Sequence, residues 1–374
     1  MFDTRALRRA LAPVLCLLLV AGAAACGDDD DGDTTSGDGG GGGGEALQIA
    51  LLLPETKTAR YETQDRPLFE AKVEDLCPEC EILYSNADQD AAEQQGQAEA
   101  ALTNGADVLV LDPVDSASAG SIVALAKAQD VPVISYDRLI TDADIDFYIS
   151  YDNEKVGELQ ATALLDKLEE DGVTSGNIVM INGSPTDNNA TLFKEGAHSV
   201  LDDSSFTVEP EYDTPDWSPD EAQREMEQAA TQLGADGFVG VYAANDGTAG
   251  GAIAAMKAAG VNPLPPVTGQ DAELAAIQRI LAGEQYMTVY KAIKPEAEIA
   301  AEVAIALARG EDPPEEWVND EVDNGQGDIP SQILDPVAVT TENVNDTIVA
   351  DGFWSAEEIC EGSYAAACEA AGIG

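Results

Sequence analysis

Histidine is almost missing from this sequence: His198 is the single one among 374 residues. A Ser-His-Asp or Cys-His arrangement and a His-rich metal site both need imidazoles that the chain does not have. No Gly-x-x-x-x-Gly-Lys-Ser/Thr loop is present, and the Gly-Thr-Ala-Gly-Gly run at 247–251 lacks the dinucleotide fingerprint. We therefore expect no metal, no nucleotide cofactor and no enzymatic activity, and we interpret His198 as an ordinary helix residue.

Basic residues are also scarce, with 18 Lys and Arg against 71 Asp and Glu and a formal net charge of −53. Such a surface is a poor partner for nucleic acid and for anionic lipid. With so many carboxylates, the proximity of two of them says little about acid-base chemistry. We interpret the excess as a solvated acidic shell suited to saline surroundings, rather than as a cation-binding patch.

The N-terminal apolar run is short. It covers residues 10–25, follows Arg5, Arg8 and Arg9, and is too short for a permanent membrane span, so we predict a signal peptide over 1–25. The run ends in Ala-Ala-Ala-Cys-Gly, which resembles a lipobox with Cys26 as the lipidated first residue of the mature chain. Ordinary cleavage nearby is the alternative, and in both cases the protein is exported.

Residues 26–45 contain aspartates, Ser, Thr and a glycine run, with almost no apolar side chain. Gly/Ser-rich and acidic chain behaves as extended flexible coil, so we predict a tether between a lipid anchor and the folded body. A calcium loop is the alternative for the aspartates, but the EF-hand spacing and its closing Glu are missing.

Four cysteines remain for the folded body once Cys16 and Cys26 are set aside. Thiols outside the cytoplasm are expected to pair, and the chain offers Cys77, Cys80, Cys360 and Cys368. A zinc knuckle or redox motif at Cys77 and Cys80 is disfavoured because no His lies near it. Local pairs, 77 with 80 and 360 with 368, are the simplest connectivity, and crossed pairs remain open.

Short apolar runs alternate with helical patterns from residue 47 onward, which predicts an α/β sheet with right-handed crossovers. The runs expected to form parallel strands are 48–53, 81–84, 108–111, 131–135, 178–181, 237–241 and 287–290. The expected helices include 90–104, 153–171, 219–233 and 295–309. About 330 residues after the tether suggest two domains.

Polar and aromatic residues follow the expected strands, where open parallel sheets place their ligands. Carboxylates and amides can bridge adjacent hydroxyls, Arg and Lys donate charge-assisted hydrogen bonds, and aromatic rings cover the C–H face of a sugar. Each of these residues alone could equally be a turn or cap residue. Together they suggest a neutral polyol as the ligand: Arg60, Tyr61, Asp137, Arg138, Asp187, Asn188, Asn189, Trp217, Asn245, Asp246, Asp271 and Lys291.

Long stretches of the chain resemble the D-xylose-binding proteins. They are YDRLITDADIDFYISYDNEKVGELQA (136–161), GSPTDNNATLF (183–193), ANDGTAGGAI (244–253), GQDAELAAIQRI (269–280) and GEQYMTVYKAI (283–293). The resemblance implies a type I periplasmic-binding fold, with two doubly wound parallel-sheet domains joined by a three-stranded hinge. It implies an N-terminal lobe of 46–151 plus 292–328 and a C-terminal lobe of 152–291 plus 329–374.

The same resemblance implies which residues contact the sugar. The polar contacts fall on Arg60, Asp137, Arg138, Asp187, Asn189, Asn245, Asp271 and Lys291. The family's two stacking tryptophans fall on Tyr61 and Trp217, so one stacking position differs from the family pattern but stays aromatic.

The resemblance also implies the partners: a monomer that closes on D-xylose or a related aldopyranose and then docks on the membrane permease of an ABC importer. We expect it on the outer face of the cytoplasmic membrane, attached through Cys26. A sugar-responsive repressor is disfavoured because a signal peptide stands where a DNA-binding headpiece would be. A sugar-sensing partner of a chemoreceptor or signalling kinase is the alternative, and an extracellular glycosidase is the enzymatic one.

Overall fold

The computed structural model describes residues 46–373, so the predicted signal peptide (1–25), tether (26–45) and lipidated Cys26 lie outside the described residues. Within 46–373 the chain forms two lobes, each with a central sheet. None of the helices in this range has the length and apolar character needed to cross a bilayer.

The first lobe is built on a seven-stranded sheet in the order β10-β11-β5-β4-β3-β1-β2. All neighbours are parallel except the hairpin of β10 and β11. The strands are β1 (Gln48–Leu53), β2 (Glu81–Asn86), β3 (Val108–Leu111), β4 (Val133–Tyr136), β5 (Phe147–Tyr151), β10 (Asp320–Asp323) and β11 (Asp328–Leu334).

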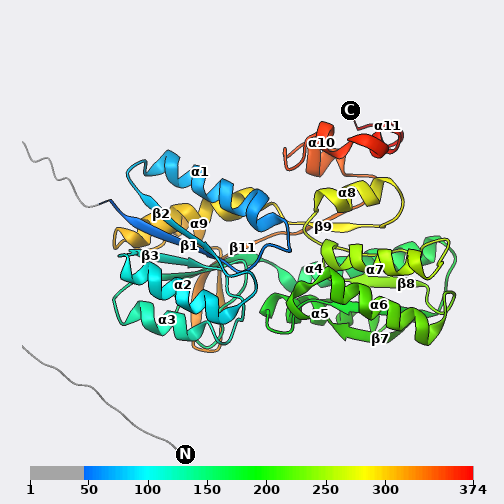
Figure 1. Cartoon of the computed structure of the whole chain (residues 1–374), viewed down its shortest axis with the longest axis horizontal. Helices are drawn as coiled ribbons and strands as arrows, with labels where there is room; N and C mark the ends of the chain where they lie inside the picture. The colour runs from blue at the N-terminus through cyan, green and yellow to red at the C-terminus, as the bar shows by residue number, and fades with distance from the viewer. Residues whose placement is uncertain (1–45, 374) are drawn as a thin grey trace, which may run out of the picture. The chain divides into compact units, whose positions relative to one another are not determined.

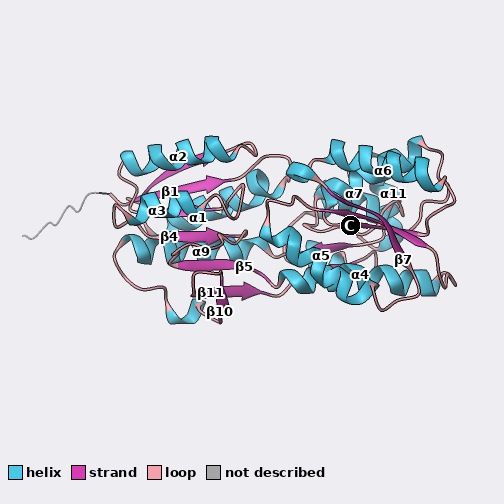
Figure 2. Cartoon of the chain, turned by 90° about the horizontal axis from the view of Figure 1, so that it is seen from below, coloured by secondary structure: helices cyan, strands magenta, loops and turns pink. Residues whose placement is uncertain are grey.

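Helices cover both faces of this sheet. On one face lie α1 (Arg66–Leu76) and α9 (Ile293–Ala308), and on the other lie α2 (Ala91–Thr103) and α3 (Gly120–Lys127), as Figure 1 shows. The short helices of this lobe are η1 (Tyr61–Asp65) and η3 (Glu315–Trp317). Each face buries its own apolar cluster, which explains why the central strands are almost continuously hydrophobic. The parallel strands run side by side in Figure 2.

The second lobe has a three-stranded parallel sheet in the order β7-β6-β8, and a two-stranded antiparallel pair of β9 and β12. Residues 267–271 link the two, because Val267 bridges to Val241 and the Val289 amide donates to the Gly269 carbonyl at 3.0 Å. The strands are β6 (Asn177–Asn182), β7 (Thr207–Asp213), β8 (Gly240–Ala243), β9 (Thr288–Tyr290) and β12 (Val337–Val339).

Four long helices sandwich this second sheet. On one face are α4 (Asn153–Glu170) and α5 (Asn188–Leu201), and on the other are α6 (Pro219–Leu233) and α7 (Asp246–Ala258). A short helix, η2 (Pro215–Trp217), connects β7 to α6. Side chains cap the helix N-termini: Asp187 accepts from the Asn189 amide, and Asn245 forms a capping box with Thr248.

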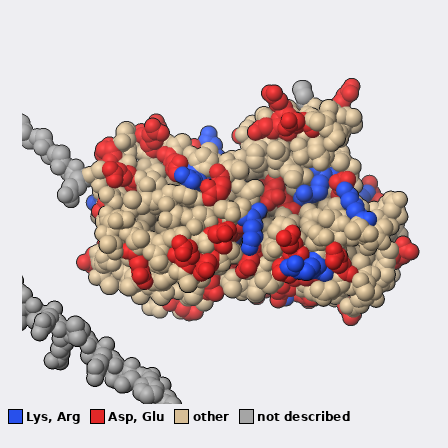
Figure 3. Space-filling view, viewed as in Figure 1, with Lys and Arg blue, Asp and Glu red and all other residues tan. Residues whose placement is uncertain are grey.

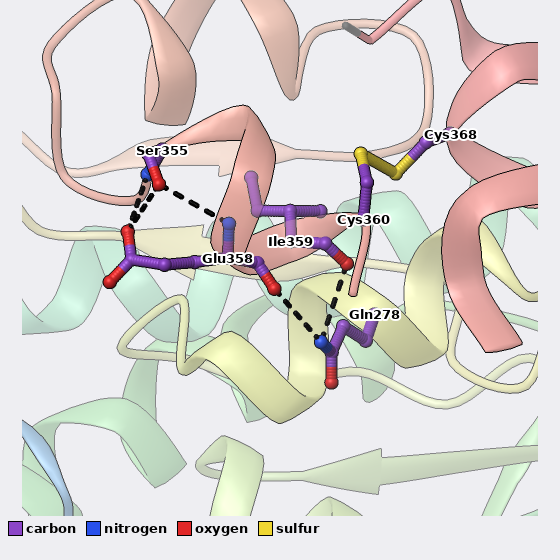
Figure 4. Close-up of a disulfide and its surroundings, with 6 residues drawn as sticks. All are labelled: Gln278, Ser355, Glu358, Ile359, Cys360 and Cys368. Atoms are coloured by element: carbon purple, nitrogen blue, oxygen red, sulfur yellow. Dashed lines mark hydrogen bonds between the residues drawn. A yellow bond between two sulfur atoms is a disulfide. The ribbon is translucent and has the colours of Figure 1, made fainter. Parts of the chain in front are cut away.

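The C-terminal segment packs against α8 (Leu274–Leu281) of the second lobe. It contains η4 (Asn345–Val349), α10 (Ala356–Ile359), η5 (Gly362–Tyr364) and α11 (Ala365–Ala371). Figure 4 shows the Cys360–Cys368 disulfide that closes it, with the Gln278 side chain donating to the carbonyls of Glu358 and Ile359 at 3.3 Å each. The second disulfide joins Cys77 to Cys80, so both local pairs expected from the sequence are present.

The helical predictions agree with α2, α4, α6 and α9, and most strand predictions agree within a few residues. Two predictions are wrong. The run at 287–290 forms β9, whose strand partner β12 is antiparallel rather than parallel. The expected C-terminal lobe includes residues 329–334, yet β11 lies in the first sheet between β5 and β10, because its apolar side chains complete that core.

The chain passes between the lobes three times: after β5, between β9 and α9, and between β11 and β12. This confirms the α/β fold with a three-stranded hinge. On the face drawn in Figure 3, acidic side chains are spread over the surface of both lobes and no extended basic patch is visible.

Candidate functional site

The predicted site residues follow strands of both sheets. In the first lobe, Arg60 and Tyr61 follow β1, and Asp137 and Arg138 follow β4. In the second lobe Asp271 ends the 267–271 segment, and the other residues follow β6, β7, β8 and β9: Asp187, Asn189, Trp217, Asn245 and Lys291. The carboxyl ends of both sheets thus face one shared space, as parallel sheets with ligand loops require.

That space is a small polar cavity, with about 260 Å³ of empty volume that includes its opening to solvent. Nine of the ten residues implied by the family resemblance line it: Tyr61, Asp137, Arg138, Asp187, Asn189, Trp217, Asn245, Asp271 and Lys291. The two other polar candidates, Asn188 and Asp246, do not line it. Arg60 lies directly behind the wall.

Asp137 is the centre of the first charged group. Its Oδ1 lies 3.3 Å from Arg60 Nη1 and 3.3 Å from Lys291 Nζ, and its Oδ2 accepts from the Tyr61 hydroxyl at 3.1 Å. Burial alone raises the pKa of Asp137, but the charges of Arg60 and Lys291 outweigh it and hold this pKa far below the usual range. Asp137 is therefore an ionised acceptor.

Arg60 acts as the support of that group. Its guanidinium donates to Asp65 at 2.6 and 2.9 Å and to Glu296 at 2.6 Å. Burial lowers the pKa of Arg60, yet the carboxylates of Asp137, Asp65 and Glu296 reverse this and raise it well above its ordinary value. The fixed cation therefore orients Asp137 from behind while leaving the cavity side open.

Arg138 forms the second charged group. Its Nε lies 3.0 Å from Asp187 Oδ2, and the guanidinium also faces Asp112 at 3.6 Å and Glu55 at 3.8 Å. Burial raises the pKa of Asp112 well above its ordinary value, which favours a neutral acid behind the charged pair. Asp187 also accepts from the Trp217 indole at 3.0 Å, so one carboxylate fixes both a cation and a ring.

Aromatic rings form the apolar part of the cavity wall: Tyr61, Phe193 and Trp217. Trp217 is only 5% exposed and meets Phe193 edge to face, with ring centroids 6.3 Å apart. A Cβ on Gly183 would lie 2.0 Å from the Trp217 ring, so only glycine there leaves room for the indole. The ring position is therefore set by its neighbours before any ligand enters.

Three cavity residues hold left-handed backbone conformations that favour glycine. The φ angles are 54° at Asp137, 51° at Trp217 and 91° at Asp271. Non-glycine residues persist in this region only where the surrounding structure fixes them, and such residues cluster at functional sites. The chain thus accepts local strain to aim these three side chains.

Hydrogen bonds join the two lobes at the rim of the cavity. The Asn189 side chain donates to the Asp137 carbonyl at 3.0 Å, and the Ser116 amide donates to the Thr186 carbonyl at 2.9 Å. The Asn188 amide also donates to the Ser116 hydroxyl at 3.1 Å. The described chain is therefore in a closed arrangement, in which both lobes surround the cavity.

Charged donors, carboxylates and rings together suit a neutral polyhydroxylated ligand. Over the part of the chain that the structure describes, no group of three or more His, Cys, Asp or Glu side chains could hold a metal ion. His198 is on α5 and pairs with Asp202 at 2.9 Å, away from the cavity lining.

Three further lining residues were not predicted: Thr58, Phe193 and Gln270. Phe193 and Gln270 lie inside the stretches 183–193 and 269–280 that carry the family resemblance, and Phe193 is one helical turn after Asn189. Helical spacing from a known contact could have identified Phe193. The supporting acids Asp65, Asp112 and Glu296 carry no such signal in a chain with 71 acidic residues.

The family model and the relatives similar in sequence point to the same family. Residues 49–312 match the model of a periplasmic binding protein domain. The chain is 40% identical over 317 residues to the D-xylose-binding periplasmic protein of Escherichia coli (strain K12), covering 84% of this chain and 92% of that protein. It is 34% identical to the multiple sugar-binding periplasmic receptor ChvE of Rhizobium radiobacter, over 73% of this chain and 81% of that protein.

Solved structures agree with the fold. An ABC transporter solute-binding protein from Clostridium phytofermentans with bound β-D-glucose superimposes with a TM-score of 0.77 at 30% identity, covering 83% of this chain and 99% of that one. A carbohydrate transporter solute-binding protein from Chloroflexus aurantiacus, in complex with D-glucose, gives 0.76 at 29% identity, over 84% and 98% of the two chains.

Proposed function

This chain belongs to the periplasmic binding proteins and is not an enzyme, and from that premise we propose that it captures D-xylose, or a closely related aldopyranose, by closure of its two lobes. Delivery to the permease of an ABC importer follows in this proposal. The observation that carries it is the cavity between the lobes, which is lined by aromatic rings and by two buried cations, Arg138 and Lys291.

In the proposed complex the sugar lies with one face of its ring on Trp217 and with Tyr61 on the opposite side. Arg138, Lys291 and Asn245 donate to hydroxyl oxygens, while Asp137, Asp187 and Asp271 accept from hydroxyl groups. Asn189 serves both the ligand and the lobe contact to the Asp137 carbonyl. Arg60 acts through Asp137, since it does not line the cavity.

Closure supplies the signal in this mechanism. The sugar can contact the binding residues of both lobes at once only when the lobes are closed. Bound sugar therefore shifts the population toward the closed form, which the permease recognises in this proposal. No bond is made or broken in the ligand. ATP hydrolysis takes place on a separate subunit in this scheme.

We also propose the setting of the molecule: export by the segment 1–25, attachment through lipidated Cys26 and a tether over 26–45. The two lobes then comprise 46–151 with 292–334 and 152–291 with 335–374, working as a monomer. A sugar-sensing role beside a chemoreceptor or signalling kinase is a second candidate, and it is favoured by the likeness to a relative named as a receptor.

Calorimetric titration with a panel of aldoses tests the proposal. We expect saturable binding of one sugar per chain, strongest for D-xylose among D-xylose, L-arabinose, D-glucose and L-fucose. Absence of binding for every sugar in the panel would overturn the proposal, and preference for another aldopyranose would change the ligand within it. Incubation with xylosides is expected to yield no product.

A further inference from the structure

The turn at residues 270–273 presents the Asp271 carboxylate to the cavity in an unusual backbone conformation. Two successive non-glycine residues have positive φ, 91° at Asp271 and 51° at Ala272. Non-glycine residues persist in this region only where the surrounding structure fixes them, so a pair of them needs strong local support.

Hydrogen bonds from the second lobe hold the amides of this turn. The Asp271 amide donates to the Val289 carbonyl at 2.9 Å, and the Ala272 amide donates to the Thr288 hydroxyl at 3.2 Å. The Glu273 amide donates to Asp246 Oδ2 at 3.0 Å. Because all three amides donate to other groups, none of them is available to the Ala272 carbonyl. A donor for this carbonyl must come from another segment.

That partner comes from the C-terminal segment. The indole Nε1 of Trp354 donates to the Ala272 carbonyl at 2.8 Å. The Trp354 ring packs edge to face on Phe353 at 5.4 Å between centroids, and Phe353 packs in the same way on Tyr290 at 5.1 Å. Residues 353 and 354 thus contact Tyr290 and Ala272. These two are the chain neighbours of Lys291 and Asp271, which line the cavity.

The segment that carries Trp354 is itself anchored. Ser355 caps the N-terminus of α10 through a capping box with Glu358, and Gln278 of α8 ties α10 to the second lobe, as Figure 4 shows. The Cys360–Cys368 disulfide closes the end of the segment. The indole therefore has a defined position from which to support the turn.

We infer that Trp354 is a positioning residue for sugar binding, which holds the 271–272 turn so that the Asp271 carboxylate stays directed into the cavity. In that position Asp271 Oδ1 lies 3.5 Å from Lys291 Nζ and 3.9 Å from Arg60 Nη1. Without the indole donor, the turn can relax toward ordinary backbone angles and move the carboxylate away. This inference rests on the proposed function.

The substitution Trp354→Phe tests it, because phenylalanine keeps an aromatic ring on Phe353 but removes the N–H donor. We expect sugar affinity to fall about threefold to tenfold, the range for the loss of one neutral buried hydrogen bond. The matched control is Trp317→Phe. The Trp317 indole donates to Glu302 at 2.8 Å on the first lobe, outside the cavity lining, so its loss should leave affinity unchanged.

A double-mutant cycle separates positioning from general destabilisation. In the Asp271→Ala background, Trp354→Phe should cause no further loss, since the carboxylate it positions is gone. An equal fold-loss in both backgrounds would show that Trp354 acts only through overall stability and would overturn the inference. Unchanged affinity in Trp354→Phe alone would do the same.

Amide hydrogen exchange in the ligand-free protein gives a readout that does not depend on the sugar. We expect the amides of residues 271–273 to exchange at least about tenfold faster in Trp354→Phe, with the rest of the second lobe unchanged. If the unaltered protein binds no aldose, the proposed function fails, while faster exchange would still show that Trp354 holds the turn. Unchanged exchange would refute the inference whether or not sugar binds.

Discussion

Replacing Trp217 with alanine removes the largest ring from the cavity wall. The indole is 5% exposed, lines the cavity and donates to Asp187 at 3.0 Å. Its loss therefore takes away the surface on which the pyranose ring stacks in the proposed complex, and one of the hydrogen bonds that fix Asp187.

The expected magnitude follows from these two contributions. Stacking on an aromatic face contributes roughly 0.5–1.5 kcal/mol beyond the area it buries. Burial of the sugar C–H face contributes a similar amount at about 25 cal/mol per Å². Together they give about 1–3 kcal/mol, so the affinity for xylose should fall about fivefold to 150-fold.

Calorimetric titration of xylose into the variant and the parent measures this change. Removing a buried tryptophan costs about 3–5 kcal/mol in folding stability, so thermal unfolding must first show that the variant is folded. Trp217→Phe keeps a flat ring but loses the N–H, and we expect an intermediate affinity. His198→Ala, on α5 outside the cavity lining, serves as the control with unchanged affinity. A folded Trp217→Ala protein that binds xylose like the parent would refute the stacking argument.

Further predictions concern charge, pH, the second ring and the disulfides. Burial raises the pKa of Asp246 to about 7, while an unfolded aspartic acid titrates near 3.9. The contribution of Asp246 to the free energy of unfolding should therefore fall as the pH rises from about 4 to about 7. Urea unfolding across this range should show a smaller decrease in stability for Asp246→Asn than for the parent, and identical profiles would contradict the prediction. With a net charge of −53, the melting temperature should rise between dilute buffer and molar sodium chloride, and no rise would count against self-repulsion as a destabilising force. Tyr61→Trp restores the family residue and should keep sugar affinity within about threefold by titration; a large loss would show that the wall cannot accept the wider ring. Mass spectrometry of the exported protein should find Cys77, Cys80, Cys360 and Cys368 oxidised, and four free thiols would contradict the structure. Replacing the Cys360–Cys368 pair with serine should lower the free energy of unfolding by about 2–3 kcal/mol.

Much of the fold could be predicted from the sequence because parallel strands of this kind are buried on both faces. Such strands appear as continuous apolar runs, as β1 and β3 do, and amphipathic patterns such as that of α9 stand between them. The strand β7 was missed because its residues alternate between partly buried and exposed, which gives a weak apolar signal. The lobe boundary near 328 was wrong because β11 joins a sheet whose other parallel strands are distant in sequence.

The cavity residues could be located because ligand loops follow strand ends, and the family resemblance narrowed the choice among them. Asp187 and Asn245 show why local reasoning alone leaves two readings, since each is a helix cap and also lines the cavity. The supporting carboxylates and the Trp354 contact could not be predicted. They depend on long-range packing between segments far apart in the sequence, and no local spacing encodes that.

A crystal structure of the protein grown with D-xylose tests the central claim most directly. The account predicts one pyranose in the cavity, with its ring on Trp217 and its hydroxyls within hydrogen-bond distance of Asp137, Arg138 and Asp271. A sugar bound elsewhere, or a closed cavity that stays free of sugar at saturating xylose, would contradict it.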